Sequence, residues 1–266
     1  MVIPRTNIYF IGMGLCGLKS CSLQALKILK IADIIFVETY TNFISEGKPE
    51  FWNEIKQKLE PLSRKDLEEN DHLFLEKIEG KIIALLIPGD PFIATTHNSI
   101  RIAATKKGYK CRLIHNSSII SAASSISGLS SYSFGRTVTC PFRNNKSEFP
   151  YRIIQQNKSI NAHTLVLLDI NLVDDEFLSV DEAISILSDL EMEIHENVFK
   201  KSSIVIGLAK IGYNDEFISA GSMDKVANSF NWRKIGPPQA LIVCADTFHF
   251  AEKEALSVLW GVNTQK

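Results

Sequence analysis

The sequence lacks any long apolar run. None of its segments approaches the roughly 20 consecutive apolar residues that a membrane-spanning helix needs. The first residues, MVIPRTNIYF, also lack the apolar stretch of a secretory signal peptide, because the proline and polar residues at positions 4–7 interrupt it. We therefore expect a chain that works in the cytoplasm and does not bind membranes.

Cysteine and net charge are scarce as well. The five cysteines are odd in number and scattered, which favours neither a disulfide framework nor a zinc site, so no metal is expected. The formal net charge is −1. Binding nucleic acid without regard to its sequence needs many phosphate-neutralising cations, so this balance argues against a direct nucleic-acid partner.

The chain does contain a recurring alternation of short apolar runs and amphipathic helical segments. The predicted strands are Ile8–Ile11, Ile34–Val37, Ile82–Ile87, Cys111–His115 and the segments HTLVLLDI, SSIVIGLAKIG and PPQALIVCAD. The predicted helices are Ser22–Ile31, Thr95–Lys107, Ser118–Leu129, SVDEAISILSDLEMEI and Phe250–Trp260. Several strands are apolar on every residue, which predicts parallel strands covered by helices on both faces. The predicted fold class is therefore α/β.

Two segments do not follow this alternation. The polar stretch Lys56–Asn70 is predicted to be helical or looped. The stretch Phe134–Asn161 carries proline, asparagine and glycine clusters with weak periodicity. We interpret this second stretch as the passage between two α/β halves.

The segment GMGLCG after the first predicted strand matches the glycine pattern of dinucleotide-binding folds. Glu38 follows at the end of the next strand, where such folds bind a ribose. In those folds, however, the third glycine opens the helix, whereas helical periodicity here begins only near Ser22. An NAD-linked oxidoreductase therefore stays an alternative, and Glu38 has the simpler interpretation of a polar strand end.

The segment PGDPFIATTHNS directly follows the predicted buried strand Ile82–Ile87, and open α/β sheets bind their ligands at the carboxyl ends of parallel strands. The prolines and the glycine of PGDP predict a tight turn that presents Asp90. Its carboxylate can accept hydrogen bonds from ribose hydroxyls or pair with an ammonium group. The alternative is an ordinary turn whose aspartate bonds to its own backbone.

Several motifs taken together resemble one family. GMGL after the first strand, GDPFIATTH, HNSSI, FGRTVT, HTLVLLDI, GLAKIG with FISAG, and a late GPP run in order from about Tyr9 to Val243. Of these, GDPFIATTH and HTLVLLDI are specific, whereas the glycine turn alone is not. The chain thus resembles the diphthine synthases, methyltransferases of the tetrapyrrole methylase-like superfamily.

The resemblance implies two α/β domains with mostly parallel sheets, residues 1–116 and 117–266, and a cofactor in the cleft between them. It implies S-adenosylmethionine as cofactor and S-adenosylhomocysteine as product. The implied substrate is the modified histidine of translation elongation factor 2, a precursor of diphthamide, methylated on the amino group of its 3-amino-3-carboxypropyl arm. The number of methyl groups stays open. Relatives are commonly dimers, so we expect a homodimer.

The cofactor positions that the resemblance implies are Leu15, Asp90, Ile93, Ser118, Ile119, Leu168, Ile211 and Gln239. Two features depart from the family pattern. Gln239 stands after GPP where a histidine is common, so the contact there is expected to be altered or to come from backbone atoms. LCGLKSCS replaces the acidic residues and the Asp-Ile-Thr triplet that usually follow the first turn.

No catalytic residue is assigned from the sequence. Methyl transfer to an amine needs the neutral nucleophile, and His97 and His115 are the histidines within the motifs that could assist removal of its proton. Arg136, Arg143 and Lys146 supply positive charge that could meet the substrate carboxylate or an acidic surface of the partner. The rival functions are methylation of a tetrapyrrole or of ribosomal RNA, a NAD(P)-linked oxidoreductase, and a binding protein without catalysis.

Overall fold

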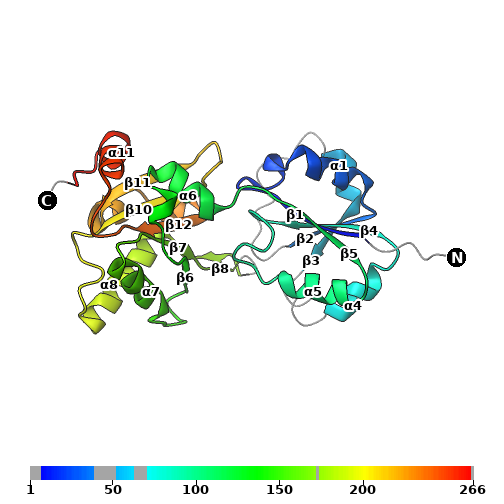
Figure 1. The fold of residues 1–266 in the computed structure, drawn as a ribbon, viewed down its shortest axis with the longest axis horizontal. Helices are drawn as coiled ribbons and strands as arrows, with labels where there is room; N and C mark the ends of the chain where they lie inside the picture. The colour runs from blue at the N-terminus through cyan, green and yellow to red at the C-terminus, as the bar shows by residue number, and fades with distance from the viewer. Residues whose placement is uncertain (1–6, 39–51, 63–70, 172–173, 265–266) are drawn as a thin grey trace. The chain divides into compact units, whose positions relative to one another are not determined.

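The computed structural model describes residues 7–38, 52–62, 71–171 and 174–264, which form two compact units (Figure 1). The first unit is Met1–Ser118 with Asn171–Asp175, and the second is Ile119–Ile170 with Glu176–Lys266. Each unit has its own five-stranded sheet. The domains 1–116 and 117–266 stay a prediction, because a compact unit is not by itself a domain that folds alone.

The sheet of the first unit is entirely parallel, with the strand order β3-β2-β4-β1-β5. Its strands are β1 (Asn7–Gly12), β2 (Ile34–Glu38), β3 (Leu59–Leu62), β4 (Ile82–Ile87) and β5 (Lys110–Ile114). The central strand β4 is apolar at every position and lies between β2 and β1. The parallel pairing predicted from its composition is confirmed.

Helices cover both faces of this sheet (Figure 1). The helical elements are η1 (Gly17–Ser20), α1 (Leu23–Ile31), α2 (Trp52–Ile55), η2 (Lys56–Lys58), α4 (Asp71–Lys77) and α5 (Asn98–Lys106). Ala25 and Leu29 of α1 pack on one face, while Phe74 of α4 and Ile100 of α5 pack on the other. Each strand therefore buries both sets of alternating side chains, as a parallel sheet requires.

The prediction that Lys56–Asn70 is helical or looped holds for its first residues and is wrong for the next four. Lys56–Lys58 form the short helix η2, and Leu59–Leu62 form the strand β3, while residues 63–70 lie outside the described residues. β3 pairs only with β2 and so lies at the edge of the sheet. An edge strand tolerates Pro61 and polar residues, because one row of its backbone groups has no strand partner. That tolerance hides the strand in the sequence.

The sheet of the second unit is mixed, with the order β11-β10-β12-β7-β6. Its strands are β6 (Val138–Cys140), β7 (Thr164–Leu168), β10 (Ile204–Ala209), β11 (Phe217–Ser222) and β12 (Gln239–Val243). The short strands β8 (Ile170–Asn171) and β9 (Glu176–Phe177) pair separately. The α/β class is confirmed, but only β6 and β7 pair in parallel here. The short link from β10 to β11 holds no crossover helix, so those two strands pair as an antiparallel hairpin.

The stretch Phe134–Asn161, predicted as a passage between two halves, is instead part of the second unit's core. It contains β6 and α7 (Phe149–Ser159), and α7 buries Tyr151, Ile153 and Ile154. The other helices are α6 (Ile119–Ser127), η3 (Ser131–Ser133), α8 (Val180–Ile194), α9 (Met223–Ala227), α10 (Trp232–Ile235) and α11 (Phe250–Trp260). α7 and α8 pack together on one face of the sheet, opposite α6 and α11 (Figure 1). Among the described helices, none has the length and apolar character to cross a membrane.

A buried histidine joins separate elements of the second unit. His163 is 1% exposed, and its Nδ1 accepts the backbone N–H of Ala245 at 2.9 Å. Its Nε2 lies 3.3 Å from Oε1 of Glu252 in α11. Because Nδ1 accepts, Nε2 carries the ring proton and donates it to the carboxylate. Burial lowers the pKa of His163 below its ordinary value, although Glu252 opposes this effect. The folded protein therefore favours the neutral ring.

We expect the free energy of unfolding to fall as the pH drops below about 6.5, the ordinary pKa of histidine. Below that pH the unfolded chain takes up a proton at His163 that the folded chain binds less readily, so stability is lost by at most about 1.4 kcal/mol per pH unit. The variant His163→Gln has no such group and should lose less between pH 7.5 and 5.5. Urea denaturation at both pH values measures the difference.

His195 offers the matched control for this measurement. It is exposed and has a positive φ of 59°, a conformation that asparagine adopts readily. His195→Asn should therefore keep the pH dependence of the parent. If His163→Gln lost as much stability as the parent over this range, the buried ring would not be the source of the effect.

Candidate active site

The two glycine-containing turns predicted from the sequence lie against each other in the first unit. β1 and β4 are neighbours, and beyond their carboxyl ends the N–H of Gly14 donates to the carbonyl of Gly89 at 3.0 Å. The N–H of Gly89 donates back to the carbonyl of Gly14 at 3.0 Å. This reciprocal pair joins the GMG turn to the PGD turn, so the two motifs form one structure.

Glycine is required at this junction because the backbones approach closely. A Cβ on Gly12 would lie 2.6 Å from the carbonyl oxygen of Gly89, closer than atoms of a folded protein come. Gly14 has a φ of 69°, and a Cβ there would lie 2.8 Å from Oγ of Ser20. The glycines of GMGLCG thus allow one turn to pack on another.

Asn116 fastens this junction from the end of β5. Its Nδ2 donates to the carbonyl of Gly12 at 3.0 Å and to the carbonyl of Ser20 at 2.9 Å. Oγ of Ser20 in turn donates to the carbonyl of Met13 at 2.5 Å. Neither Asn116 nor Ser20 is among the site residues predicted from the sequence. The HNSSI motif, placed directly after a strand at the same sheet edge, was the signal that could have found Asn116.

The geometry does not fit a dinucleotide cradle. The helix α1 begins only at Leu23, after the separate turn η1, with Ser22 as its N-cap accepting the N–H of Ala25 at 3.2 Å. Glu38, the predicted ribose contact, is 1% exposed and lies 3.2 Å from Nε2 of the buried His97. At the glycines only the four-residue 3-10 helix η1 begins and no α-helix does, and the Glu38 carboxylate is buried beside His97, so the groups that would hold a pyrophosphate and a ribose are not in place.

Asp90 occupies the turn after β4 and is held from β5. Its Oδ2 accepts the backbone N–H of Asn116 at 2.9 Å and lies 2.9 Å from Nδ1 of His115. Its side chain is 13% exposed. Two residues of the turn, Phe92 and Ala94, have positive φ of 68° and 54°. This backbone delays the next helix, so α5 begins at Asn98 and not at the predicted Thr95.

The other cofactor residues predicted for the first unit lie near this turn in sequence or in space. Leu15 directly follows the Gly14 junction and is half-buried. Ser118 approaches the other turn, since a Cβ on Gly89 would lie 3.9 Å from its Cα and its Oγ. Ile93 is 40% exposed, unusual for a large apolar side chain in a tight turn.

The cofactor residues predicted for the second unit lie at one edge of its sheet, apart from Ile119, the first residue of α6. Leu168 ends β7, Gln239 begins β12 and Ile211 follows β10. The pairing of Gln239 with Ala209, and of Ala240 with Leu167, brings these three positions to the same edge. The structure therefore brings Leu168, Ile211 and Gln239 to one edge of the second sheet and leaves Ile119 apart from them.

The Gln239 side chain is fully engaged within the second unit. Its Oε1 accepts the N–H of Val180, the first residue of α8, at 3.0 Å. Its Nε2 donates to the carbonyls of Trp232 at 2.7 Å and Gly236 at 3.0 Å. The residue that replaces the usual histidine thus ties α8 and α10 to the start of β12. Both N–H groups of its amide are thus used within the fold.

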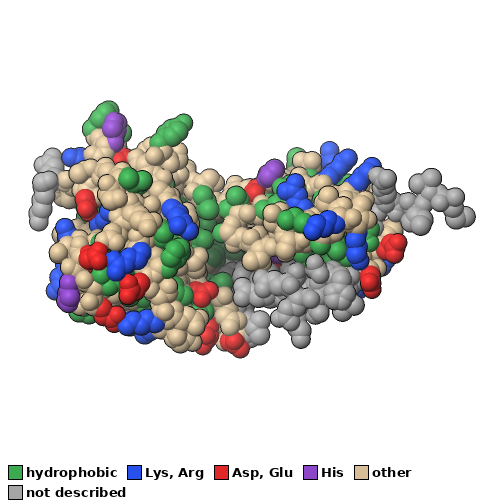
Figure 2. Space-filling model, turned by 60° about the horizontal axis from the view of Figure 1, so that its bottom comes forward, with side chains coloured by type: hydrophobic (Ala, Val, Ile, Leu, Met, Phe, Trp, Pro, Cys, Tyr) green, Lys and Arg blue, Asp and Glu red, His purple; other side chains and the backbone are tan. Residues whose placement is uncertain are grey.

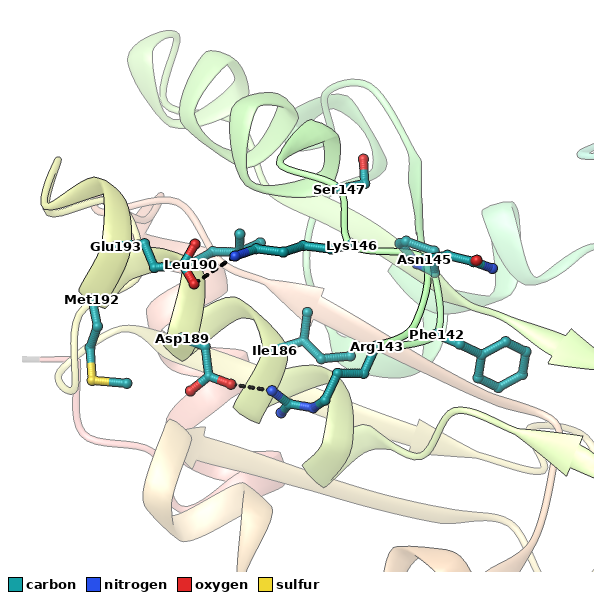
Figure 3. Close-up of a pocket in the computed structure, with 11 residues that line it drawn as sticks. Phe142, Arg143, Asn145, Lys146, Ser147, Ile186, Asp189, Leu190, Met192 and Glu193 are labelled. Carbon is teal, nitrogen blue, oxygen red and sulfur yellow. Dashed lines mark hydrogen bonds and ion pairs between the residues drawn. The ribbon is translucent and has the colours of Figure 1, made fainter.

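Arg143 and Lys146 are paired with acids of α8 (Figure 3). The guanidinium of Arg143 binds the carboxylate of Asp189, and Nζ of Lys146 lies 2.8 Å from Oε1 of Glu193. Positive and negative side chains are accordingly intermixed on this side of the second unit (Figure 2). The expectation that these two residues supply positive charge to a substrate or partner stays a prediction, and in this structure both are paired with acids of the same unit. Their pairing depends on acids of α8 that lie 46 and 47 residues further along the chain.

The same residues line a pocket of about 320 Å³ between the loop after β6 and α8 (Figure 3). Phe142, Ile186 and Leu190 supply its apolar part. The predicted cofactor residues, all of which the structure describes, are not among its lining residues. Arg136 lies apart from the acids, with its guanidinium carbon 5.2 Å from the ring centre of Phe149.

The described residues offer no metal-binding cluster, and two of their cysteines have unreactive thiols. Within the described ranges, no cluster of three or more His, Cys, Asp or Glu side chains could hold a metal ion. Burial raises the pKa of the Cys21 and Cys140 thiols to about 12. These two cysteines are therefore protonated at neutral pH and supply no nucleophile.

The junction of the two turns leads to a stability prediction. We expect Gly14→Ala to lower the free energy of unfolding by at least about 1 kcal/mol more than Gly108→Ala does. Both glycines have positive φ, 69° and 84°, so both variants carry the same kind of backbone strain. Only at Gly14 does the new methyl group meet other atoms, since a Cβ at Gly108 has nothing within 4 Å. Equal losses in urea denaturation would show that the junction tolerates a side chain.

The chain matches the family Tetrapyrrole (Corrin/Porphyrin) Methylases over residues 7–227. It is 38% identical over 264 residues to a diphthine synthase of Methanosphaera stadtmanae, covering 97% of both chains. It is 34% identical over 250 residues to a diphthine synthase of Archaeoglobus fulgidus, covering 93% of both. A crystal structure of a diphthine synthase superposes with a TM-score of 0.83 at 31% identity, covering 96% of both chains.

These similarities extend over nearly the whole chain and so include the motifs whose residues are described above. The geometry at Gly14, α1 and Glu38 independently argues against the dinucleotide alternative. The chain therefore belongs to the diphthine synthases, and it is a methyltransferase of the tetrapyrrole methylase family.

Proposed function

We propose that this methyltransferase uses S-adenosylmethionine to methylate the amino group of the modified histidine of translation elongation factor 2. The observation that carries the proposal is the Asp90 turn, a partly exposed carboxylate on a rigid backbone at the carboxyl edge of a parallel sheet. Similarity to diphthine synthases over almost the full chain supports the choice of substrate. The proposed setting is the cytoplasm, where translation takes place.

Asp90 suits a ligand that carries hydroxyl or ammonium groups. Its Oδ2 contacts Asn116 and His115, whereas the hydrogen bond that Oδ1 makes within the described part of the chain is the one with His115, at 3.3 Å. Oδ1 therefore keeps acceptor capacity for a ribose hydroxyl or an amino group of the cofactor. Leu15, Ile93 and Ser118 would add apolar and polar contacts beside it, which fits a nucleoside better than a bare anion.

The residues proposed for the second unit would contribute mainly through their backbone. Ile119, Leu168, Ile211 and Gln239 include three aliphatic side chains and one amide whose hydrogen bonds are already made. Strand ends present unpaired N–H and C=O groups, which can bind an adenine edge or a methionine chain. Gln239 would therefore serve the cofactor through its main chain, and a histidine there is not needed for binding.

Bound S-adenosylmethionine supplies a sulfonium methyl group that an amine attacks in line. Charge disperses in the transition state of such a displacement, so the chain contributes chiefly by positioning the amine and excluding water. Rigid elements are suited to this task. The Gly14–Gly89 junction and Asn116 fix Asp90 with respect to β1, β4 and β5.

The test is transfer of a labelled methyl group to elongation factor 2 that carries the unmethylated arm. We expect transfer by the parent, and cofactor binding by calorimetry that Asp90→Asn weakens roughly 10- to 100-fold, because a charged hydrogen bond contributes about 1.5–3 kcal/mol. Asp33→Asn is the matched control. Asp33 also accepts a backbone N–H, that of Ile82 at 2.7 Å, but at the amino edge of the same sheet.

Three outcomes of this test would count against the proposal. Unchanged affinity in Asp90→Asn, or an equal loss in Asp33→Asn, would remove Asp90 from the cofactor site. Labelling of a tetrapyrrole or of ribosomal RNA in place of the factor would assign the methyltransferase to another substrate.

We also propose that the chain forms a homodimer through the exposed face of α11. Val258 and Leu259 of this helix are 75% and 55% exposed, and Tyr132 in the neighbouring η3 is fully exposed. The two elements are linked, since the N–H of Ser130 donates to Glu252 at 3.0 Å. Apolar side chains gathered on adjoining elements favour burial against a like surface.

Sedimentation equilibrium tests the homodimer. The parent should sediment with the mass of two chains, and Val258→Glu should shift it toward one, because the dimer would bury an unpaired charge. Ile160→Glu, at the end of α7, is the control because Ile160 is 73% exposed, close to the value for Val258. A parent that sediments as one chain, or equal effects of both variants, would contradict the proposal.

A further inference from the structure

His115 forms a pair with Asp90 at the carboxyl edge of the first sheet. Its Nδ1 lies 2.9 Å from Oδ2 and 3.3 Å from Oδ1 of that carboxylate. A carboxylate only accepts hydrogen bonds, so Nδ1 carries the proton and the lone pair of the neutral ring lies on Nε2. The His115 side chain is 70% exposed, and among the described residues no hydrogen bond reaches Nε2.

The carboxylate that orients this ring is itself held in place. Asp90 accepts the N–H of Asn116 at 2.9 Å, and Asn116 is fixed by its own two hydrogen bonds to the backbone of the glycine turn. The hydrogen bond to Asp90 therefore fixes the tautomer and the orientation of the His115 ring, and the basic Nε2 points away from the carboxylate. A carboxylate that orients a histidine in this way is the arrangement of a general base in many unrelated enzymes.

The other histidine that the motifs suggested for proton removal, His97, does not share this geometry. His97 is 2% exposed, and its Nε2 lies 3.2 Å from Oε2 of Glu38, which is 1% exposed. A ring enclosed in this way exchanges protons with neither a ligand nor water without a structural change. Exposure therefore separates the two histidines, and His115 is the one that a substrate can reach.

We propose that His115 is the general base of the methyl transfer, accepting on Nε2 a proton from the ammonium group of the substrate arm. This role rests on the proposed function. The N–H bond breaks and its proton moves to Nε2. The freed nitrogen lone pair then forms a bond to the methyl carbon of the sulfonium, and the C–S bonding pair stays on sulfur as a neutral thioether.

The exposure of the ring matters for repeated methylation. Each transfer from a sulfonium to an ammonium group releases one proton, so a base that serves successive rounds must lose its proton after each one. At 70% exposure His115 passes that proton directly to water. In the described residues, Asp90 is the titratable group in contact with the ring, and a carboxylate there also stabilises the imidazolium that forms in between.

The variant His115→Asn separates this role from a merely structural one. The asparagine amide can donate to Asp90 as Nδ1 does, but it has no group that titrates. We expect its S-adenosylmethionine affinity by calorimetry to stay within about twofold of the parent. Methyl transfer to elongation factor 2 at pH 7 should fall on the order of 100-fold, the usual contribution of a general base. The deficit should shrink toward pH 9.5, because the substrate amine then loses its proton to water.

Two further variants complete the experiment. In His115→Ala, added imidazole should restore part of the rate, because the exposed position admits a free base. His195→Asn removes an exposed histidine of the second unit and should keep the rate and pH profile of the parent. A parent-like rate and profile in His115→Asn would overturn the proposal. So would a deficit that is constant with pH, accompanied by weaker cofactor binding and no rescue, since that pattern belongs to a positioning residue. Absence of any transfer by the parent would instead overturn the proposed function, and this role with it.

Discussion

The two backbone hydrogen bonds between Gly14 and Gly89 are the constraint on which the rest of the site depends. They join the loops that follow two neighbouring parallel strands, and glycine suits both positions because both have a positive φ, 69° at Gly14 and 68° at Gly89. Asn116 then closes the junction from a third strand. With three strand ends fixed together, the carboxylate of Asp90 has little freedom, so a ligand at the proposed site would meet groups that are already organised.

Three histidine–carboxylate pairs within the described residues show how burial decides what a pair can do. His163 with Glu252, and His97 with Glu38, are almost fully buried. The first joins strand ends to α11, and the second links β2 to the segment before α5. His115 with Asp90 is built from the same chemical groups but leaves the ring in solvent. A ring that water reaches can exchange its proton with solvent, whereas an enclosed one can do so only after the structure opens.

At two positions, residues that match a ligand-binding motif make structural contacts instead. GMGLCG has the spacing of a dinucleotide fingerprint, yet the space beside its first two glycines is occupied by a second turn and by Asn116. Gln239 stands where the family resemblance leads us to expect a histidine, and its amide joins α8 and α10 to β12. In both cases a residue type compatible with ligand binding makes its contacts within the fold. A sequence motif therefore does not by itself show that its residues bind a ligand, because the same residue types can make their hydrogen bonds and packing contacts within the fold.

The sequence by itself determined the elements whose pattern is local. The apolar run of β4, the Ser22 start of α1, the helix Phe250–Trp260 and the Asp90 turn follow from periodicity, capping and turn chemistry within a few residues. The tertiary structure alone decided the edge strand β3, the place of α7 in the core and the antiparallel pairings of the second sheet. It also decided which histidine is exposed and why Asn116 matters. The physical reason is distance along the chain, since the bond from Asn116 to Gly12 spans 104 residues, and no local pattern records such a contact.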